Sequence, residues 1–299
     1  MLNFLNYLIV GLRLGSVYAL IALGYTMVYG IIRMINFAHG DFIMVGGYTL
    51  VFTIPMVTQN LGLPAWTSVI CAVVICAIVG MLVEFTAYRP VRRKGTGMSA
   101  LITAIAMSLI LENLAQAIPA IGPNPKIPAR IFPNETLNLG GVTMDLTTLY
   151  TILVSAAVMI ALTLFVKKTK LGRAMRAVSE NKKASVLMGV NVDKTILLTF
   201  AIGSALAAVA ALMYISQYPK VFSTIGSSLG LKAFVAAVLG GIGIIPGAMI
   251  GGLVIGLVES FTTAYISSSL ADAFVFLILI IVLLIKPTGI LGRNEGEKV

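Results

Sequence analysis

The sequence carries very little charge. Only 11% of its 299 residues are Asp, Glu, Lys or Arg, whereas 59% are hydrophobic. Soluble domains average about 25% charged and about 45–50% apolar residues. A soluble globular enzyme is therefore excluded. A disordered chain is excluded as well, because disordered chains are poor in apolar residues. The composition predicts an all-α fold, a polytopic membrane helical bundle.

Histidine and cysteine are also scarce, which excludes most catalytic chemistry. His39 is the single histidine, so a Ser-His-Asp triad could be built only around it. Cys71 and Cys76 lie five residues apart in an apolar run, and we expect free thiols rather than a disulfide or a metal pair. A phosphate-binding loop ending in Gly-Lys-Ser or Gly-Lys-Thr is missing. We therefore expect no enzyme activity, no ATP hydrolysis, and no metal or cofactor in this chain.

Long uncharged runs indicate the membrane spans, since about 20 apolar residues cross the hydrocarbon. The runs are 14–32, 42–83 (two crossings), 98–120, 147–166, 195–219, 233–258 and 273–285. A break in 233–258 is needed to leave Lys286 and Arg293 on the same side as the basic loops, and Pro246-Gly247 is the expected break. The sequence thus predicts one transmembrane domain, 1–299, with about eight crossings, some short or broken.

Lysine and arginine are distributed unevenly between the two sides. The loops 88–97 and 167–194 hold 12 of the 21 basic residues, whereas segment 121–146 has equal numbers of basic and acidic residues. Because cytoplasmic loops are enriched in Lys and Arg, we expect both basic loops in the cytoplasm and 121–146 as an external loop. This asymmetry also explains the net charge of +10. It favours a lipid bilayer as the partner and no nucleic acid.

Two polar constellations interrupt the apolar runs. Asn36, His39 and Asp41 lie between the first two spans. They predict either a substrate gate or proton relay, or a polar cytoplasmic turn near the membrane surface in which Asn36 or Asp41 caps a helix. Glu112 lies 14 residues into its run, and we expect it in the outer half of that span. It either lines a pathway or makes a buried contact.

A glycine ladder occupies the broken run. Gly243, Gly247 and Gly251 recur every four residues around Pro246. Small residues at this spacing let helices approach closely in lipid. Close packing is one interpretation of these four residues, and a hinge for a transport cycle is the other.

The basic loop 167–194 is too long for a simple connector and contains a predicted short helix. Ser179 is the expected N-cap and Gly189 the expected C-terminal stop. Ala184, Leu187 and Met188 form a small apolar face at helical spacing. Such a face either lies on the inner leaflet or inserts into a cleft on a soluble partner. The missing nucleotide-binding loop favours the partner.

Several long motifs resemble a known family. They are GSVYALIALGYTMVYGIIRMINFAHGDF (15–42), AYRPVRRK (87–94), GRAMRAVSENKKASVLMGVNVDK (172–194), KAFVAAVLGGIGIIPGAMIGGL (232–253) and KPTGILGR (286–293). Together they resemble the LivH-type permease subunit of branched-chain amino acid ABC transporters, and the resemblance runs nearly from end to end.

The resemblance implies a permease subunit in the bacterial inner membrane that imports leucine, isoleucine or valine. It implies a second, LivM-type permease as heterodimer partner, two cytoplasmic ABC ATPase subunits that bind ATP-Mg, and a periplasmic amino-acid-binding protein. It also implies that 167–194 is the coupling loop, with Glu180, Asn181, Ala184 and Gly189 in its core. The alternatives from other classes are a proton-coupled secondary transporter with His39, Asp41 and Glu112 as relay groups, and a passive channel.

Overall fold

The computed structural model describes residues 2–95, 97–132, 135–139 and 142–292. Its elements are α1 (Leu2–Ile32), η1 (Phe37–His39), α2 (Asp41–Pro55), η2 (Met56–Asn60), α3 (Thr67–Val83), η3 (Glu84–Tyr88), α4 (Arg89–Lys94), α5 (Gly97–Ala117), β1 (Thr136–Leu139), β2 (Val142–Asp145), α6 (Leu146–Lys168), α7 (Lys170–Glu180), α8 (Lys182–Leu187), α9 (Val192–Gln217), α10 (Ile225–Gly240), α11 (Ile245–Tyr265), η4 (Ser268–Leu270) and α12 (Ala271–Ile285). The strands form one antiparallel hairpin, in which Leu137 pairs with Met144.

Eight helical stretches in the described residues are long and apolar enough to cross a membrane. They are Asn3–Ile32, Phe37–Asn60, Thr67–Lys94, Met98–Ala117, Leu146–Lys168, Val192–Gln217, Ile245–Tyr265 and Ser268–Ile285. The shorter helix α10 has 16 residues, about 24 Å at 1.5 Å per residue. The prediction of an all-α membrane helical bundle with about eight crossings, some short or broken, is confirmed.

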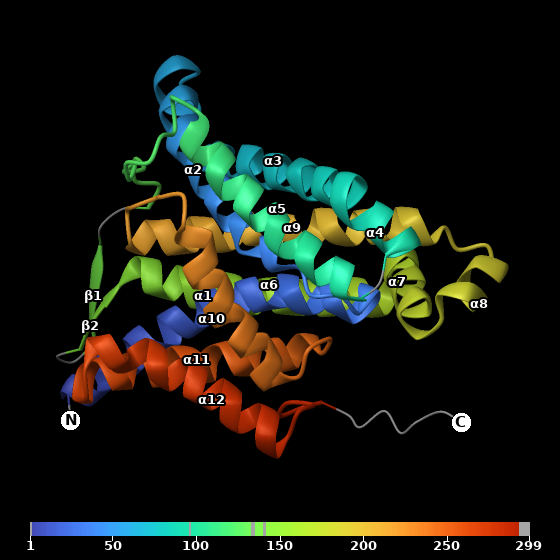
Figure 1. Cartoon of the computed structure of the whole chain (residues 1–299). Coiled ribbons are helices and arrows are strands. Elements are labelled where there is room, and N and C mark those ends of the chain that lie inside the picture. The colour runs from blue at the N-terminus through green and yellow to red at the C-terminus, as the bar shows by residue number, and fades with distance from the viewer. Residues whose placement is uncertain (1, 96, 133–134, 140–141, 293–299) are drawn as a thin grey trace.

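The two ends of the bundle differ in character (Figure 1). The β-hairpin lies at one end, which we call the hairpin end, together with the start of α1. Helices α7 and α8 project from the opposite end, which we call the basic end. Segments 121–146 and 167–194 therefore lie at opposite ends, as their charge balance predicted. Arg293, part of the parity argument, lies outside the described residues.

The predicted break in the run 233–258 exists, but not at Pro246-Gly247. Helix α10 ends at Gly240 and α11 begins at Ile245. Gly241 and Gly243, between them, have φ of 102° and 96°, values that glycine adopts without steric cost. Pro246 lies in the first turn of α11, where its missing N–H costs no helical hydrogen bond. The glycines make the break, and the proline starts the next helix.

Burial divides the helices into an inner and an outer set. The most apolar window of α9 is 67% buried, whereas that of α12 is 11% buried. Glycines allow the inner helices to approach closely: a Cβ on Gly15 of α1 would lie 2.7 Å from the Leu253 Cα of α11. Outer helices such as α12 expose Leu277, Ile280 and Leu284, as lipid-facing helices do.

Candidate functional site

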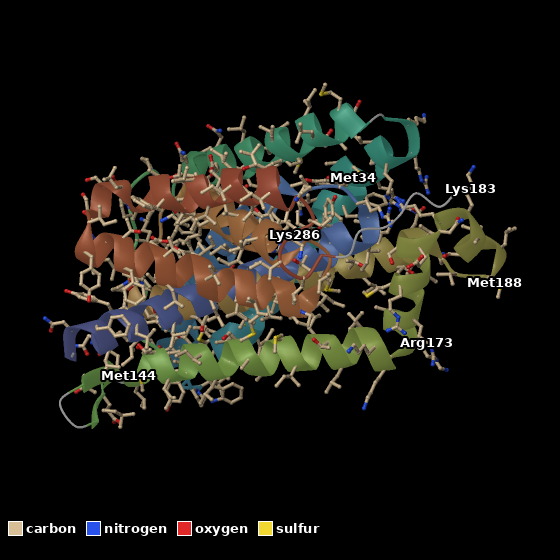
Figure 2. All side chains as sticks on the ribbon, turned by 90° about the horizontal axis from the view of Figure 1, so that it is seen from below. Met34, Met144, Arg173, Lys183, Met188 and Lys286 are labelled. Atoms are coloured by element: carbon tan, nitrogen blue, oxygen red, sulfur yellow. The ribbon has the colours of Figure 1, made fainter. Side chains whose placement is uncertain are left out.

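Helices α7 and α8 form a projection at the basic end, built from residues of the predicted coupling loop. Figure 2 shows Lys183 and Met188 at its tip, far from Met144 of the hairpin. Asn181 starts α8, because its side-chain oxygen accepts a hydrogen bond from the Ala184 N–H (3.0 Å). Ser179 was predicted for this role, and that prediction is wrong. Its hydroxyl donates to the Arg176 carbonyl within α7.

The end of α8 was predicted correctly. Gly189 has φ of +79°, and the Gly189 and Val190 N–H groups donate to carbonyls of the last turn. Val186, Leu187 and Met188 are 60%, 88% and 83% exposed. Glu180, Asn181 and Ala184 are exposed too. The tip is therefore a capped helical turn that presents large apolar side chains.

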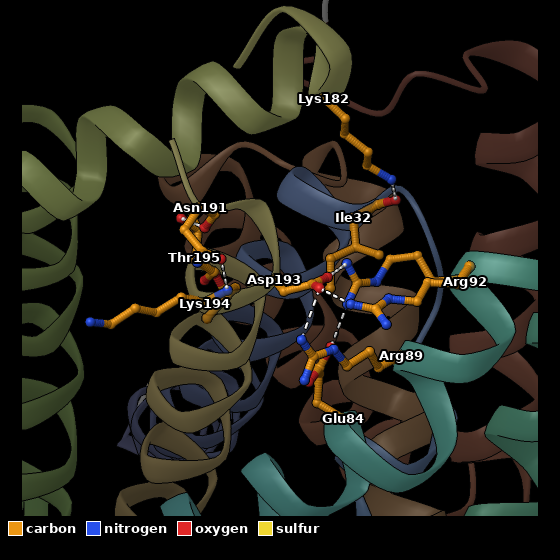
Figure 3. Close-up of polar contacts among 11 residues, drawn as sticks. Ile32, Glu84, Arg89, Arg92, Lys182, Asn191, Asp193, Lys194 and Thr195 are labelled. Carbon is orange, nitrogen blue, oxygen red and sulfur yellow. Dashed lines mark hydrogen bonds and ion pairs between the residues drawn. The ribbon is translucent and has the colours of Figure 1, made fainter. Parts of the chain in front are cut away.

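The projection is fixed to the bundle by polar contacts (Figure 3). Lys182 Nζ donates to the carbonyl of Ile32, the last residue of α1 (3.4 Å). Burial lowers the pKa of Lys182, and the neighbouring guanidinium groups of Arg92 and Arg33 lower it further. Lys182 therefore connects the projection to the end of α1, and a displacement of the projection would act on α1 through this contact.

Five charged residues form what we call the Arg92 cluster: Glu84, Arg89, Arg92, Arg93 and Asp193 (Figure 3). Arg92 bridges Glu84 Oε1 (2.6 Å) and Asp193 Oδ1 (3.1 Å), and Arg89 binds Asp193 Oδ2 (2.9 Å). Arg93 also pairs with Asp193. The cluster joins η3 and α4 to the first turn of α9, directly after the projection. Sequence analysis counted these arginines as topology signals and did not pair them.

Asn36, His39 and Asp41 do not form a surface turn. They are 2%, 0% and 0% exposed. His39 packs against Gly24, eight residues before the end of α1, so the chain re-enters the bundle by about 12 Å. Asn36 accepts a hydrogen bond from the Tyr88 hydroxyl (2.7 Å) and, like Asp41, makes no side-chain cap. The surface-turn interpretation fails because packing against α1 draws the segment inward.

Glu112 lies near this segment, in the half of α5 towards the hairpin end, as predicted. It is 9% exposed, accepts a hydrogen bond from the Ser227 hydroxyl, and interacts electrostatically with Asp41. A second α5 residue, Gln116, donates to Ser223 (3.1 Å). The structure therefore brings Asp41 and Glu112 together beside the first turn of α10.

The glycine ladder is used for packing. A Cβ on Gly247 would collide with the Gly240 carbonyl, and a Cβ on Gly251 with the Ala236 carbonyl. Both glycines thus bring α11 against α10. Gly243 does not continue the ladder, because it precedes the start of α11. The hinge interpretation stays a prediction.

Sequence analysis missed a second group of paired polar residues, which we call the Lys232 cluster: Tyr18, Lys232, Glu259 and Asp272. Lys232 directly precedes the run 233–258, and Glu259 directly follows it. In the sequence, both residues therefore resemble the charges that commonly flank a membrane span. Their opposite charges were the available signal, because charged side chains at membrane depth pair with one another.

Comparisons with known proteins agree with this architecture. The family model for the branched-chain amino acid transport system / permease component matches residues 7–283. The high-affinity branched-chain amino acid transport system permease protein LivH of Salmonella typhimurium is 44% identical, covering 100% of this chain and 98% of its own. The corresponding protein BraD of Pseudomonas aeruginosa is 43% identical, covering 99% and 98%.

One solved structure aligns with most of this chain. PsaBC from Streptococcus pneumoniae in complex with Fab aligns with a TM-score of 0.48 and 16% identity over 95% of this chain and 91% of that chain. The family assignment depends on the sequence matches, which extend over nearly the whole chain. The chain belongs to the family of permease components of branched-chain amino acid transport systems.

Proposed function

We propose that this chain is the permease subunit of an ATP-driven importer of leucine, isoleucine and valine in the bacterial inner membrane. The names of its full-length relatives support the transport function and the substrate class. The observation that carries the ATP-driven mechanism is the α7–α8 projection. It presents Val186, Leu187 and Met188 to a partner at the basic end.

The partners follow from the same division of the molecule into two ends. Two cytoplasmic ABC ATPase subunits, which bind ATP-Mg, dock on the α7–α8 projection. A periplasmic amino-acid-binding protein docks at the hairpin end. A second, LivM-type permease completes the translocation path. This chain supplies no ATPase activity of its own.

Coupling proceeds through contacts at the basic end. When ATP closes the ATPase pair, the docked tip of α8 moves. Lys182 carries that motion to the end of α1, and Asp193 carries it to α4 through the Arg92 cluster. Because α1 and α9 are inner helices, their displacement opens one side of the path and closes the other. The cycle is alternating access with a weak substrate site in the membrane.

The alternative is a proton-coupled secondary transporter of a small neutral solute with His39, Asp41 and Glu112 as relay groups. Burial of all three residues is compatible with a relay. The family match and the relatives give this alternative no support. It would require that His39→Ala abolish transport while the complex still assembles.

Reconstitution tests the proposal. Proteoliposomes would contain this chain, its second permease and both ATPases, with binding protein outside and ATP inside. Uptake of radiolabelled leucine is expected only when binding protein and ATP are both present. A pH gradient that drives uptake without ATP would contradict the proposal and favour the relay.

A further inference from the structure

A cavity of about 610 Å³ lies between α1, α9, α10 and α11. Its aromatic and charged lining residues are Tyr7, Tyr18, Tyr214, Tyr218, Lys232 and Glu259. Tyr214 and Tyr218 lie at the end of α9, and Glu259 lies six residues before the end of α11. The cavity is therefore in the half of the bundle nearer the hairpin end, which we predict to be external.

Two charged residues line this cavity, Lys232 and Glu259, and a third, Asp272, pairs with Lys232 from outside the lining. Lys232 Nζ of α10 lies 2.7 Å from Glu259 Oε1 of α11 and 2.7 Å from Asp272 Oδ1 of α12. The Tyr18 hydroxyl donates to the second oxygen, Glu259 Oε2 (2.7 Å). One cation faces two carboxylates, so the Lys232 cluster carries a formal charge of −1. That excess attracts a cationic group on a ligand.

The cluster also has bonding capacity left for an anionic group. An ammonium group has three N–H donors. Glu259 and Asp272 occupy two of those of Lys232, so the third can meet a ligand carboxylate. Lys232 and Glu259 are 15% and 14% exposed, partly desolvated, which strengthens their electrostatic interactions.

The remaining walls of the cavity are apolar or aromatic. Val10 and Leu14 of α1, Leu229 of α10 and Ala264 of α11 contribute aliphatic surface beside the tyrosine rings. The volume falls within the range of about 300–1,000 Å³ typical of small-molecule sites. A ligand with opposite charges at one end and an aliphatic chain at the other fits this lining.

A purely structural ion pair is a weak explanation for the Lys232 cluster. Charged side chains within membrane spans are costly and mark functional sites by default. A buried pair also adds little stability over apolar residues of similar size. Here Lys232 and Glu259 line a cavity, so a ligand can contact both of them.

We propose that this cavity binds a free amino acid as its zwitterion, with an aliphatic side chain, during transport. Glu259 takes the α-ammonium group, Lys232 takes the α-carboxylate, and the tyrosine-lined wall takes the side chain, while Asp272 adds negative charge behind Lys232. The inference rests on the proposed function and deepens it by locating a substrate site within this chain.

Saturation-transfer NMR on the complete transporter in phosphatidylglycerol nanodiscs tests the site without the binding protein. Leucine carries both charged groups, leucine methyl ester only the ammonium, and 4-methylpentanoate only the carboxylate. Loss of a charge-assisted contact is expected to raise the dissociation constant by about tenfold to a hundredfold. Lys232→Met should weaken leucine binding by this factor and should not weaken binding of the methyl ester. Glu259→Gln should weaken binding of leucine and of the methyl ester and should not weaken binding of 4-methylpentanoate.

Lys220→Met is the matched control, because Lys220 is exposed in the loop after α9. It should bind all three ligands like the unmodified chain, and Lys232→Arg should retain leucine binding. Equal weakening of all three ligands by Lys232→Met would indicate a structural role and overturn the proposal. No leucine signal from the unmodified complex would overturn it too. So would loss of that signal in phosphatidylethanolamine nanodiscs, because the lipid headgroup would then be the occupant.

Uptake by the same preparations separates this proposal from the proposed function. If leucine uptake depends on ATP but the variants do not change binding of the three ligands as expected, the cavity site is overturned and the importer is supported. If the variants change ligand binding as expected but uptake does not depend on ATP, the cavity site is supported and the importer is overturned.

Discussion

The Arg92 cluster and the Lys232 cluster use the same chemistry for different tasks. Each joins helices that are distant in sequence through a basic side chain that bridges two carboxylates. The Arg92 cluster has three cations and two carboxylates and lies beside the α7–α8 projection. The Lys232 cluster has an excess negative charge, and its residues Tyr18, Lys232 and Glu259 line a cavity nearer the hairpin end. The position and the net charge of each cluster, rather than its ion pairs, therefore distinguish a structural contact between helices (the Arg92 cluster) from a ligand-binding site (the Lys232 cluster).

Arg92→Met should give the largest loss of stability. It leaves Glu84, 1% exposed, without its ion-pair partner. Leaving one partner of a buried pair uncompensated costs about 3–5 kcal/mol. Thermal unfolding can be followed with a thiol-reactive dye, since Cys76 is fully buried in the folded chain. Adding Glu84→Gln should restore part of the lost stability. An unchanged melting temperature for Arg92→Met would mean that the Arg92 cluster does not stabilise the fold.

Lys232→Met should destabilise the chain less. Glu259 keeps its hydrogen bond from the Tyr18 hydroxyl when Lys232 is lost, and Asp272 is 65% exposed and keeps its solvation, so we expect about 1–3 kcal/mol. The same melting experiment, repeated with excess leucine, sharpens the comparison. Leucine should raise the melting temperature of the Arg92→Met variant and leave that of Lys232→Met unchanged. Equal leucine stabilisation of both variants would place the ligand elsewhere.

Ala184→Arg should separate coupling from stability at the basic end. Ala184 is exposed on α8, so the free energy of unfolding should change by about 0.5 kcal/mol or less. A bulky charge at a docking surface should nevertheless abolish ATP-dependent uptake in proteoliposomes. Ala184→Ser is the matched control and should transport normally. Normal uptake by Ala184→Arg would rule out this face of α8 as the docking surface.

Arg93→Met should have the smallest effect. Arg93 is 58% exposed, and exposed ion pairs contribute about 0–1 kcal/mol. Asp193 also retains Arg89 and Arg92. Melting temperature and uptake should both stay close to those of the unmodified chain. If Arg93→Met lost as much stability as Arg92→Met, burial would not explain how much each arginine of this cluster contributes to stability.

Local sequence determined the spans, the separation of the loops to opposite ends of the bundle and the ends of many helices. Hydropathy is a property of a short segment, so eight spans could be predicted from uncharged runs. The basic loops and segment 121–146 lie at opposite ends because charge resists crossing the bilayer. Gly189 ends α8 because its left-handed conformation is a local backbone preference.

Tertiary structure alone decided which polar residues meet. Tyr18 and Glu259 are 241 positions apart, and their contact depends on how closely α1 packs against α11. The burial of His39 likewise depends on the space that Gly24 leaves in α1. Even the break after α10 moved from Pro246 to Gly241–Ile244, because a proline is equally compatible with the start of a helix. Helix packing sets these contacts, and packing is a property of surfaces brought together from the whole chain.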